Sequence, residues 1–220
     1  MSTSGPIIRV NSVVEYIGGG ESGQPLLDHV SIEVPPATSV GIMGPPRSGK
    51  STLARLMAGQ TSAYRGGVEI TGHVSWAPSF PLRLMPSLTL RDYVHFVAQM
   101  YQADPDQVLD NVNTLCGFPE GRNPALGEFD RLGRGKLAIA LKYALDFDCY
   151  ILDEPSFTND QTFRALTETY TERLRGRRSV VFFAKSERPL RRFCDVIYRL
   201  EAGSLQGPEA TAPLPQNGTE

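Results

Sequence analysis

The sequence has few cysteines and no long apolar segment. Its 220 residues contain three cysteines, Cys116, Cys149 and Cys194, which lie far apart and form no CxxC pair. Three isolated cysteines are typical of a protein in a reducing compartment, where they are buried as small apolar side chains, rather than of a disulfide framework. No stretch reaches the about 18 apolar residues that a membrane span requires, and residues 1–6 do not resemble a signal peptide. We therefore expect a cytoplasmic chain that is soluble by itself.

An excess of positive charge is also missing. The 22 Lys and Arg residues are scattered among 24 Asp and Glu residues, and the net charge is -2. No broad basic surface is therefore expected, which argues against nucleic acid as a partner. The chain is 40% apolar, which is enough to bury the core of one domain with an additional lobe.

Short β-rich runs, broken by Gly and Pro, fill the first third of the sequence and predict strands. Further along, two apolar runs enclose a helical stretch, as in a parallel α/β sheet. The expected strands are residues 7–10, 31–34, 39–43, 149–152 and 180–184, and the expected helices are 51–58 and 161–174.

The middle of the chain, residues 78–141, differs from the parts on either side and predicts an inserted helical subdomain. Thr89 and Asp92 form a capping pattern before apolar residues at helical spacing, and a second helix is expected over 106–115. The core then comprises residues 1–77 and 142–205. Residues 206–220 are rich in Pro and Gly and have almost no large apolar side chains, so we expect a disordered tail.

One segment between a predicted strand and a predicted helix matches the pattern GxxxxGK[ST]. In this pattern the backbone N–H groups of a glycine-rich turn and of a helix start surround phosphate oxygens, and a lysine neutralises their charge. Lys50 is expected to contact the outer phosphates and the Ser51 hydroxyl to bind Mg²⁺. The expected phosphate-binding residues are Gly44, Pro45, Pro46, Arg47, Ser48, Gly49, Lys50, Ser51 and Thr52.

A pair of carboxylates follows the apolar run 149–152. Asp153 is expected to hold Mg²⁺, and Glu154 to act as the general base that polarises the water attacking the terminal phosphate. An apolar run that ends in Asp-Glu is weak evidence alone. Together with a phosphate loop about a hundred residues earlier and a helical insert between them, it predicts an ATP site with Mg²⁺.

With these motifs, residues 8–205 resemble the ATP-binding subunits of ABC transporters. The resemblance implies an α/β fold with a RecA-like P-loop NTPase core, an N-terminal antiparallel β subdomain and the inserted helical subdomain. It also implies an ATPase that works as a homodimer or heterodimer, bound to a separate membrane permease at the inner face of the cell membrane. Tyr16 resembles the family's aromatic residue that stacks on adenine, although a turn aromatic explains it equally well, and Asp160 resembles its dimer-contact aspartate. Within the family, the chain looks most like the ATPases of capsular polysaccharide export, from its length and from residues 72–76, 96–101 and 145–148.

Three positions depart from the family pattern. Without gaps, the signature that approaches the partner's ATP becomes residues 129–133, with Asp130 where a serine donates; a shifted reading, residues 132–136, requires a three-residue deletion. Lys185 occupies the place of the switch histidine, and Ser79 that of the Q-loop glutamine. A lysine can contact phosphate as a point charge, but it does not accept a proton as a neutral imidazole does.

Three hypotheses follow. In the first, the chain is a transport ATPase in which Glu154, Lys50 and Lys185 act on ATP and a permease exports a polysaccharide or glycolipid. In the second, Asp130 and Lys185 mark a degenerate subunit that binds ATP and hydrolyses it poorly. A third, a P-loop kinase for a small metabolite, leaves the Asp-Glu-Pro strand end and residues 194–203 unexplained.

Overall fold

The computed structural model describes residues 5–17, 24–77, 86–119, 121–153 and 160–211. These residues belong to two compact units. The first comprises Met1–Pro78, Phe147–Glu154 and Glu172–Glu220, and the second comprises Ser79–Asp146 and Pro155–Thr171. The second unit therefore takes in most of the helix after the Asp-Glu pair, in addition to the predicted insert.

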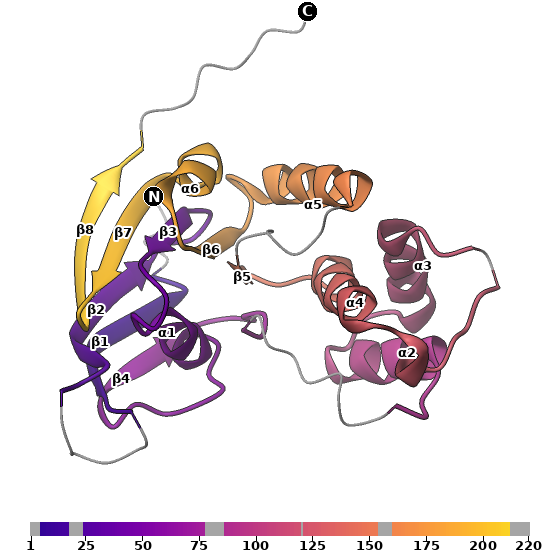
Figure 1. Cartoon of the computed structure of the whole chain (residues 1–220), viewed down its shortest axis with the longest axis horizontal. Coiled ribbons are helices and arrows are strands. Elements are labelled where there is room, and N and C mark those ends of the chain that lie inside the picture. The colour runs from indigo at the N-terminus through magenta and orange to yellow at the C-terminus, as the bar shows by residue number, and fades with distance from the viewer. Residues whose placement is uncertain (1–4, 18–23, 78–85, 120, 154–159, 212–220) are drawn as a thin grey trace, which may run out of the picture. The chain divides into compact units, whose positions relative to one another are not determined.

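The first unit contains two sheets (Figure 1). The antiparallel sheet has the order β2-β1-β4, and the other has the order β5-β6-β3-β7-β8. In the second sheet β5, β6, β3 and β7 run parallel, and β8 runs antiparallel to β7. The strands are β1 (Ile8–Glu15), β2 (Leu27–Val34), β3 (Ser39–Met43), β4 (Arg65–Ile70), β5 (Cys149–Asp153), β6 (Ser179–Ala184), β7 (Val196–Glu201) and β8 (Ser204–Ala210).

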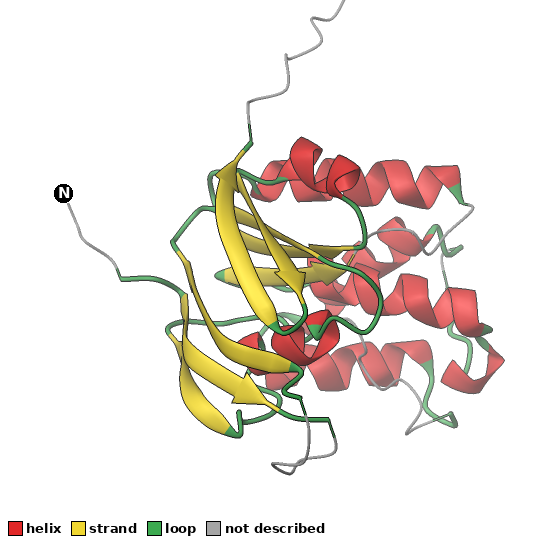
Figure 2. Ribbon diagram, turned by 60° about the vertical axis from the view of Figure 1, so that its left-hand side comes forward, coloured by secondary structure: helices red, strands yellow, loops and turns green. Residues whose placement is uncertain are grey.

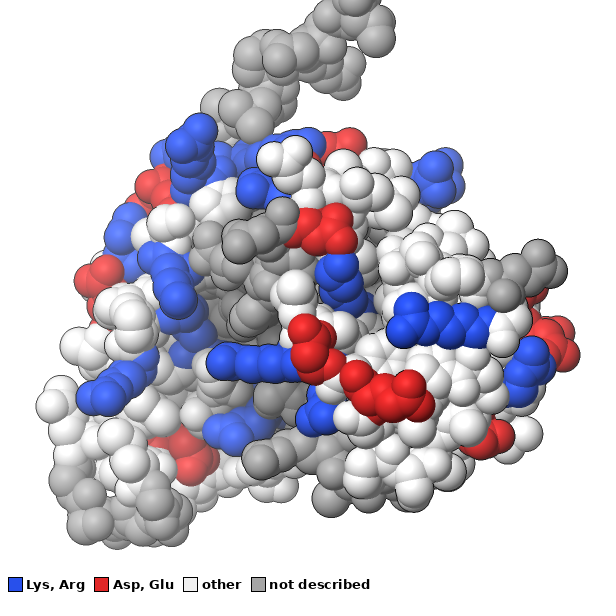
Figure 3. All heavy atoms as spheres, turned by 45° about the vertical axis from the view of Figure 1, so that its right-hand side comes forward, with Lys and Arg blue, Asp and Glu red and all other residues white. Residues whose placement is uncertain are grey.

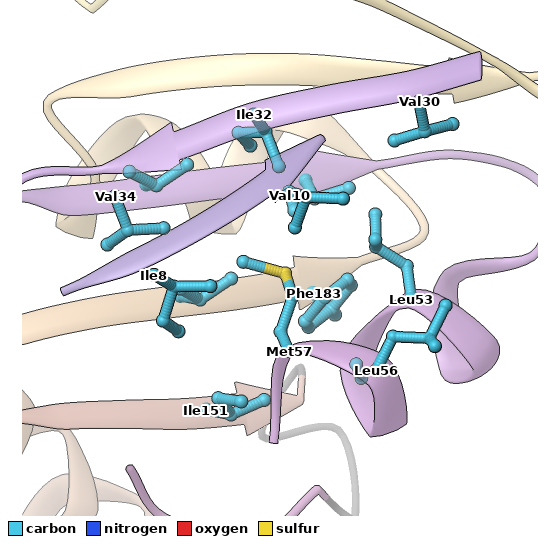
Figure 4. Packing of buried hydrophobic residues seen from close by; sticks show 14 of the residues in the cluster. Ile8, Val10, Val30, Ile32, Val34, Leu53, Leu56, Met57, Ile151 and Phe183 are labelled. Carbon is cyan, nitrogen blue, oxygen red and sulfur yellow. The ribbon is translucent and has the colours of Figure 1, made fainter. Parts of the chain in front are cut away.

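The core of this unit lies around helix α1 (Lys50–Met57). Every residue of β3 and of β6 is buried, as expected for central parallel strands covered on both faces. The apolar face of α1 supplies Leu53, Leu56 and Met57, which pack with residues of β1 and β2 on one side and with Ile151 and Phe183 on the other (Figure 4). One apolar cluster therefore joins the two sheets and fixes the start of α1.

The described elements of the second unit are helices (red in Figure 2). The Thr89 side chain caps α2 by accepting from the Asp92 N–H at 3.2 Å, as the sequence predicted. Asp104 caps α3 in the same way through the N–H groups of residues 106 and 107. The elements are α2 (Leu90–Met100), α3 (Pro105–Cys116), a 3-10 turn (Leu126–Glu128), α4 (Arg131–Ala144) and α5 (Gln161–Leu174) up to Thr171.

The predicted fold class is confirmed, and two local predictions change. β4 was not predicted, because Gly66 and Gly67 hide its alternation, and pairing with β1 makes it a strand. The prediction of disorder from residue 206 onward is wrong for residues 206–210. These residues continue β8, which hydrogen-bonds to β7 although it has few apolar side chains. Within the described part of the chain, no helix is both long enough and apolar enough to cross a membrane.

Candidate functional site

Several of the predicted site residues of the first unit lie at the carboxyl ends of its parallel strands. β3 runs into the segment 44–49, and the Gly44 N–H donates to the Ala184 carbonyl at the end of β6 at 3.3 Å. Along the same edge, Asp153 is the last residue of β5 and is in register with Phe183. Lys185 follows β6 directly and is exposed. The carboxyl edge of a parallel sheet is where α/β folds bind ligands.

Two glycines of the loop are required by their surroundings. A Cβ on Gly44 would lie 2.3 Å from the Leu200 carbonyl oxygen and 2.7 Å from the Ser48 hydroxyl. Gly49 has a φ of 100°, and a Cβ there would lie 2.8 Å from a Leu27 methyl group. The first glycine lets β7 pass close to the loop, and the second lets the chain turn into α1.

The start of α1 has the properties of an anion-binding site. Gly49 is the N-cap residue and offers no side-chain acceptor, and the first turn contains no acidic residue. The N–H groups of this turn therefore have no side-chain cap, and the helix dipole favours negative charge there. Ser51 is exposed on this turn and Thr52 is half-buried. In the preceding loop, Pro45, Pro46 and Arg47 are exposed, whereas Ser48 is buried.

The Lys50 ammonium lies over the loop. It donates to the Gly44 carbonyl at 2.5 Å, to the Pro45 carbonyl at 2.7 Å and to the Ser48 hydroxyl at 3.4 Å. These contacts keep a positive charge beside the N–H groups of the turn. This arrangement of loop backbone and cation is compatible with the phosphate cradle that the motif predicts.

Tyr16 is held beside this loop by the hairpin of β1 and β2. The Glu15 carbonyl accepts from the Leu26 N–H at 2.7 Å, and the Leu26 carbonyl lies 3.1 Å from the position of a Gly49 Cβ. The half-buried Tyr16 ring also contacts Tyr64, which the sequence analysis did not single out. Once β4 is known, Tyr64 is recognisable as an aromatic residue at its start, close to the end of β1.

Two predicted residues, Glu154 and Ser79, lie outside the described residues, so their roles stay predictions. The backbone of Asp153 lies at the predicted strand end. Among the described residues, no group of three or more His, Cys, Asp and Glu side chains could hold a metal ion by itself. A Mg²⁺ ion bound through one carboxylate, one hydroxyl and phosphate oxygens needs no such group.

In the second unit, Asp130 caps its own helix. It is the N-cap residue of α4, and its carboxylate accepts from the Gly133 N–H at 2.7 Å. The helix start therefore falls within residues 129–133, while residues 132–136 lie inside α4. This favours the ungapped signature reading, because only residues at a helix start present free backbone N–H groups to a phosphate.

Lys136, which the shifted reading would direct at a nucleotide, forms an ion pair within the second unit. Its ammonium donates to the Asp160 carboxylate and lies 5.4 Å from the centre of the Phe163 ring. The Asp160 carboxylate also accepts from the Phe163 N–H at 3.0 Å, at the start of α5. Asp160, the predicted dimer-contact aspartate, is therefore paired with Lys136 of α4, the helix that begins at the predicted signature segment.

We predict that the pKa of the Asp160 carboxyl lies below its ordinary value, first because of the hydrogen bond from Lys136 and then because of that from the Phe163 N–H. A lowered carboxyl pKa contributes stability above the pKa of the unfolded chain, and this contribution is lost as the pH falls through the folded value. Lys136→Met should raise the Asp160 pKa toward 3.8, and Lys136→Arg should keep it low. Titration of the carboxyl carbon by NMR measures this directly, and an unchanged pKa in Lys136→Met would contradict the assigned cause.

Among the described residues, the remaining charges are mixed in sign and the cysteines are wholly or partly buried. On the face drawn in Figure 3, Lys and Arg side chains are interspersed with Asp and Glu side chains, in line with the net charge of -2. All three cysteines are free, and burial raises the pKa of each thiol to about 12. They are therefore protonated at neutral pH and poor nucleophiles.

A glycine-rich loop between a buried parallel strand and a helix, with an aspartate at the end of another strand of the sheet, defines a P-loop nucleotide-binding protein. The sequence profile described as "ABC transporter" matches residues 27–157, more than half of the chain. The chain belongs to this family, and it is an ATP-binding ATPase subunit.

Relatives and solved structures agree with this assignment. The chain is 28% identical to the ATP-binding protein BexA of Haemophilus influenzae, over 90% of this chain and 92% of BexA. It is 27% identical to the capsule polysaccharide export ATP-binding protein CtrD of Neisseria meningitidis, over 82% and 83%. It is 28% identical to the polysialic acid transport ATP-binding protein KpsT of Escherichia coli, over 76% and 78%.

Two solved structures share the fold. One, described as the ATP-binding subunit of an ABC transporter, has a TM-score of 0.77 at 20% identity and covers 93% of this chain and 90% of its own. The other, the ATP-binding cassette MJ0796 in a dimeric post-hydrolysis state with ADP and Pi, has a TM-score of 0.79 at 18% identity. It covers 94% of this chain and 100% of its own.

Proposed function

We propose that the chain couples ATP hydrolysis to the export of a polysaccharide or glycolipid through a separate membrane permease. The observation that carries this proposal is the likeness to capsule polysaccharide export and polysialic acid transport ATP-binding proteins, over 82% and 76% of this chain. The match to CtrD covers about four fifths of both chains, so the likeness extends beyond the phosphate loop that all P-loop proteins share.

We assign the following roles to the site residues. Lys50 and the N–H groups at the start of α1 bind the phosphates of ATP, and Tyr16 stacks on the adenine. Ser51 and Asp153 hold Mg²⁺, which would neutralise charge on the phosphates. Glu154 takes a proton from the attacking water, and Lys185 places a cation beside the terminal phosphate.

The same proposal assigns two partners. A second ATP-binding subunit, identical or not, completes each ATP site with its signature segment, and an integral membrane permease receives the motion on the cytoplasmic side of the inner membrane. Asp130 stands in the signature where the family has a donor, and its carboxylate already accepts from Gly133. A carboxylate that is neutralised by its own helix start repels phosphate less than a free one, because the dipole and the hydrogen bond offset its charge.

A second candidate function rests on the same two residues. Asp130 is an acceptor where the family has a donor, and Lys185 does not hold a water as a neutral histidine does. In this alternative the chain binds ATP, hydrolyses it poorly and regulates a transporter together with an orthodox ATPase subunit.

Purification of the intact membrane complex through a tag on this chain tests both candidates. Under the export proposal, a protein with membrane-spanning helices copurifies, and the complex sustains ATP turnover that Glu154→Gln abolishes while ATP binding is retained. A complex that also contains a second ATP-binding chain, with ATP turnover that Glu154→Gln leaves intact, would favour the second candidate. The identified subunits also show whether the dimer has one kind of chain or two.

A further inference from the structure

Tyr16 has a second aromatic residue beside it. The rings of Tyr16 and Tyr64 have centroids 5.4 Å apart and planes at 89° to each other. This T-shaped arrangement is the favoured geometry of an aromatic pair, because the positive edge of one ring meets the negative face of the other. In this geometry the Tyr64 ring contacts either one edge or one face of the Tyr16 ring. The contact with Tyr64 therefore leaves at least one face of the Tyr16 ring uncovered by Tyr64.

The two antiparallel strands bring these rings together. Val14 of β1 is opposite Arg65 of β4, so Tyr16, just after the end of β1, and Tyr64, just before the start of β4, lie on neighbouring chain segments. The Tyr64 N–H donates to the Glu15 carboxylate at 3.1 Å. The Arg65 guanidinium carbon lies 5.8 Å from the centre of the Tyr64 ring. A backbone hydrogen bond and a neighbouring cation therefore hold Tyr64 in place independently of its contact with Tyr16.

Tyr16 directly follows Glu15, which connects the end of β1 to the phosphate loop through Leu26. Glu15 accepts from the Leu26 N–H through its carbonyl, and the Leu26 carbonyl lies against Gly49. Stacking on a base costs less free energy when the plane of the ring is already held, since a freely rotating tyrosine loses rotamer freedom when it stacks.

We propose that Tyr64 is a positioning residue that holds the ring of Tyr16 in the orientation for stacking on the adenine of ATP. The inference rests on the proposed role of Tyr16 and adds a residue that the phosphate-loop motif does not contain. Tyr64 is 43% exposed, so its ring contributes little to the core. Its contribution is to the base end of the nucleotide site, and the phosphate end is independent of it.

The test separates binding of the base from binding of the phosphates. ATP and inorganic tripolyphosphate, each with Mg²⁺, are titrated into the full chain by calorimetry. Tyr64→Leu should weaken ATP binding about 3- to 10-fold, the size of one aromatic pair, and change tripolyphosphate binding less than about twofold. Tyr64→Phe should behave as the unsubstituted chain does, because it keeps the ring. In Tyr16→Leu, the further change Tyr64→Leu should have no effect on ATP binding.

The variants distinguish failure of the inference from failure of the site. If Tyr16→Leu weakens ATP binding and Tyr64→Leu does not, the inference is overturned and the role of Tyr16 stands. If Tyr16→Leu leaves ATP binding unchanged, the adenine platform itself is refuted, and the inference with it. Equal weakening of ATP and tripolyphosphate would show a general structural effect and also overturn the inference. Should Tyr64→Leu unfold, Tyr64→Met provides the same comparison with a flexible side chain of similar length.

Discussion

Replacement of Lys50 by alanine should weaken binding of MgATP about 100-fold and remove measurable ATP turnover. The Lys50 ammonium lies over the loop, within 2.5 Å of the Gly44 carbonyl and 2.7 Å of the Pro45 carbonyl. A lysine that donates to two phosphate oxygens at this place contributes on the order of 3 kcal/mol, the sum of two hydrogen bonds that involve a charged group. A factor of 100 in affinity corresponds to about 2.8 kcal/mol.

The matched control is Arg55→Ala, on the same helix. Arg55 is an exposed cation of the last turn of α1, and its guanidinium donates to the Thr52 hydroxyl at 3.4 Å. This variant should bind MgATP within about twofold of the unsubstituted chain, since a weak exposed contact contributes little. Calorimetry gives both affinities, and thermal melts verify that each variant is folded. ATP binding by folded Lys50→Ala at the original affinity would refute the phosphate site.

Replacement of Gly44 by alanine should lower the free energy of unfolding by about 1–3 kcal/mol, and more if the loop cannot yield. The added methyl group would lie 2.3 Å from the Leu200 carbonyl oxygen, which belongs to the backbone of β7. A side chain could turn away from such a clash, but β7 is paired on both sides, with β3 and β8. The loop must move instead, so ATP binding should fall together with stability.

Gly67→Ala is the control for this substitution. It also adds one methyl group, here within β4, but apart from its chain neighbours no atom lies within 4 Å of the new Cβ. Its free energy of unfolding should change by less than about 0.5 kcal/mol, whereas Gly44→Ala should lower the melting temperature by roughly 3 to 10 °C. Melts of the two variants at one protein concentration make the comparison. Equal melting temperatures would show that the Leu200 contact tolerates a side chain.

The elements with local signals were predictable from the sequence. The start of α2 depends on Thr89 and Asp92, which are three residues apart, and the capping pattern identifies both. The strand β3 is a short run of residues between Gly and Pro clusters, and its complete burial follows from its central place among parallel strands. For α2 the energetic reason lies within a few residues. For β3 the local pattern marks the strand, whereas its pairing partners β6 and β7 lie far away in the sequence.

Elements that depend on a pairing partner were missed. β4 and residues 206–210 of β8 have poor strand composition, and each becomes a strand by hydrogen bonding, β4 to the distant β1 and β8 to the preceding β7. A propensity argument does not contain that neighbour, because β-structure depends on cross-strand pairing more than on intrinsic preference. The contact of Tyr16 with Tyr64 is of the same kind, since 48 residues of sequence separate the two rings.

In the phosphate loop, too, some features were predictable from local sequence and others depended on the tertiary structure. The sequence by itself predicted that residues 44–52 form a phosphate cradle with Lys50 as its cation, because this chemistry needs a fixed local spacing of Gly, Lys and Ser. Only the tertiary structure decided why Gly44 must lack a side chain, through the Leu200 carbonyl, and how Asp130 is used, as a cap that accepts from Gly133. The physical reason is that steric exclusion and charge compensation act through space, between atoms that the chain brings together only when it folds.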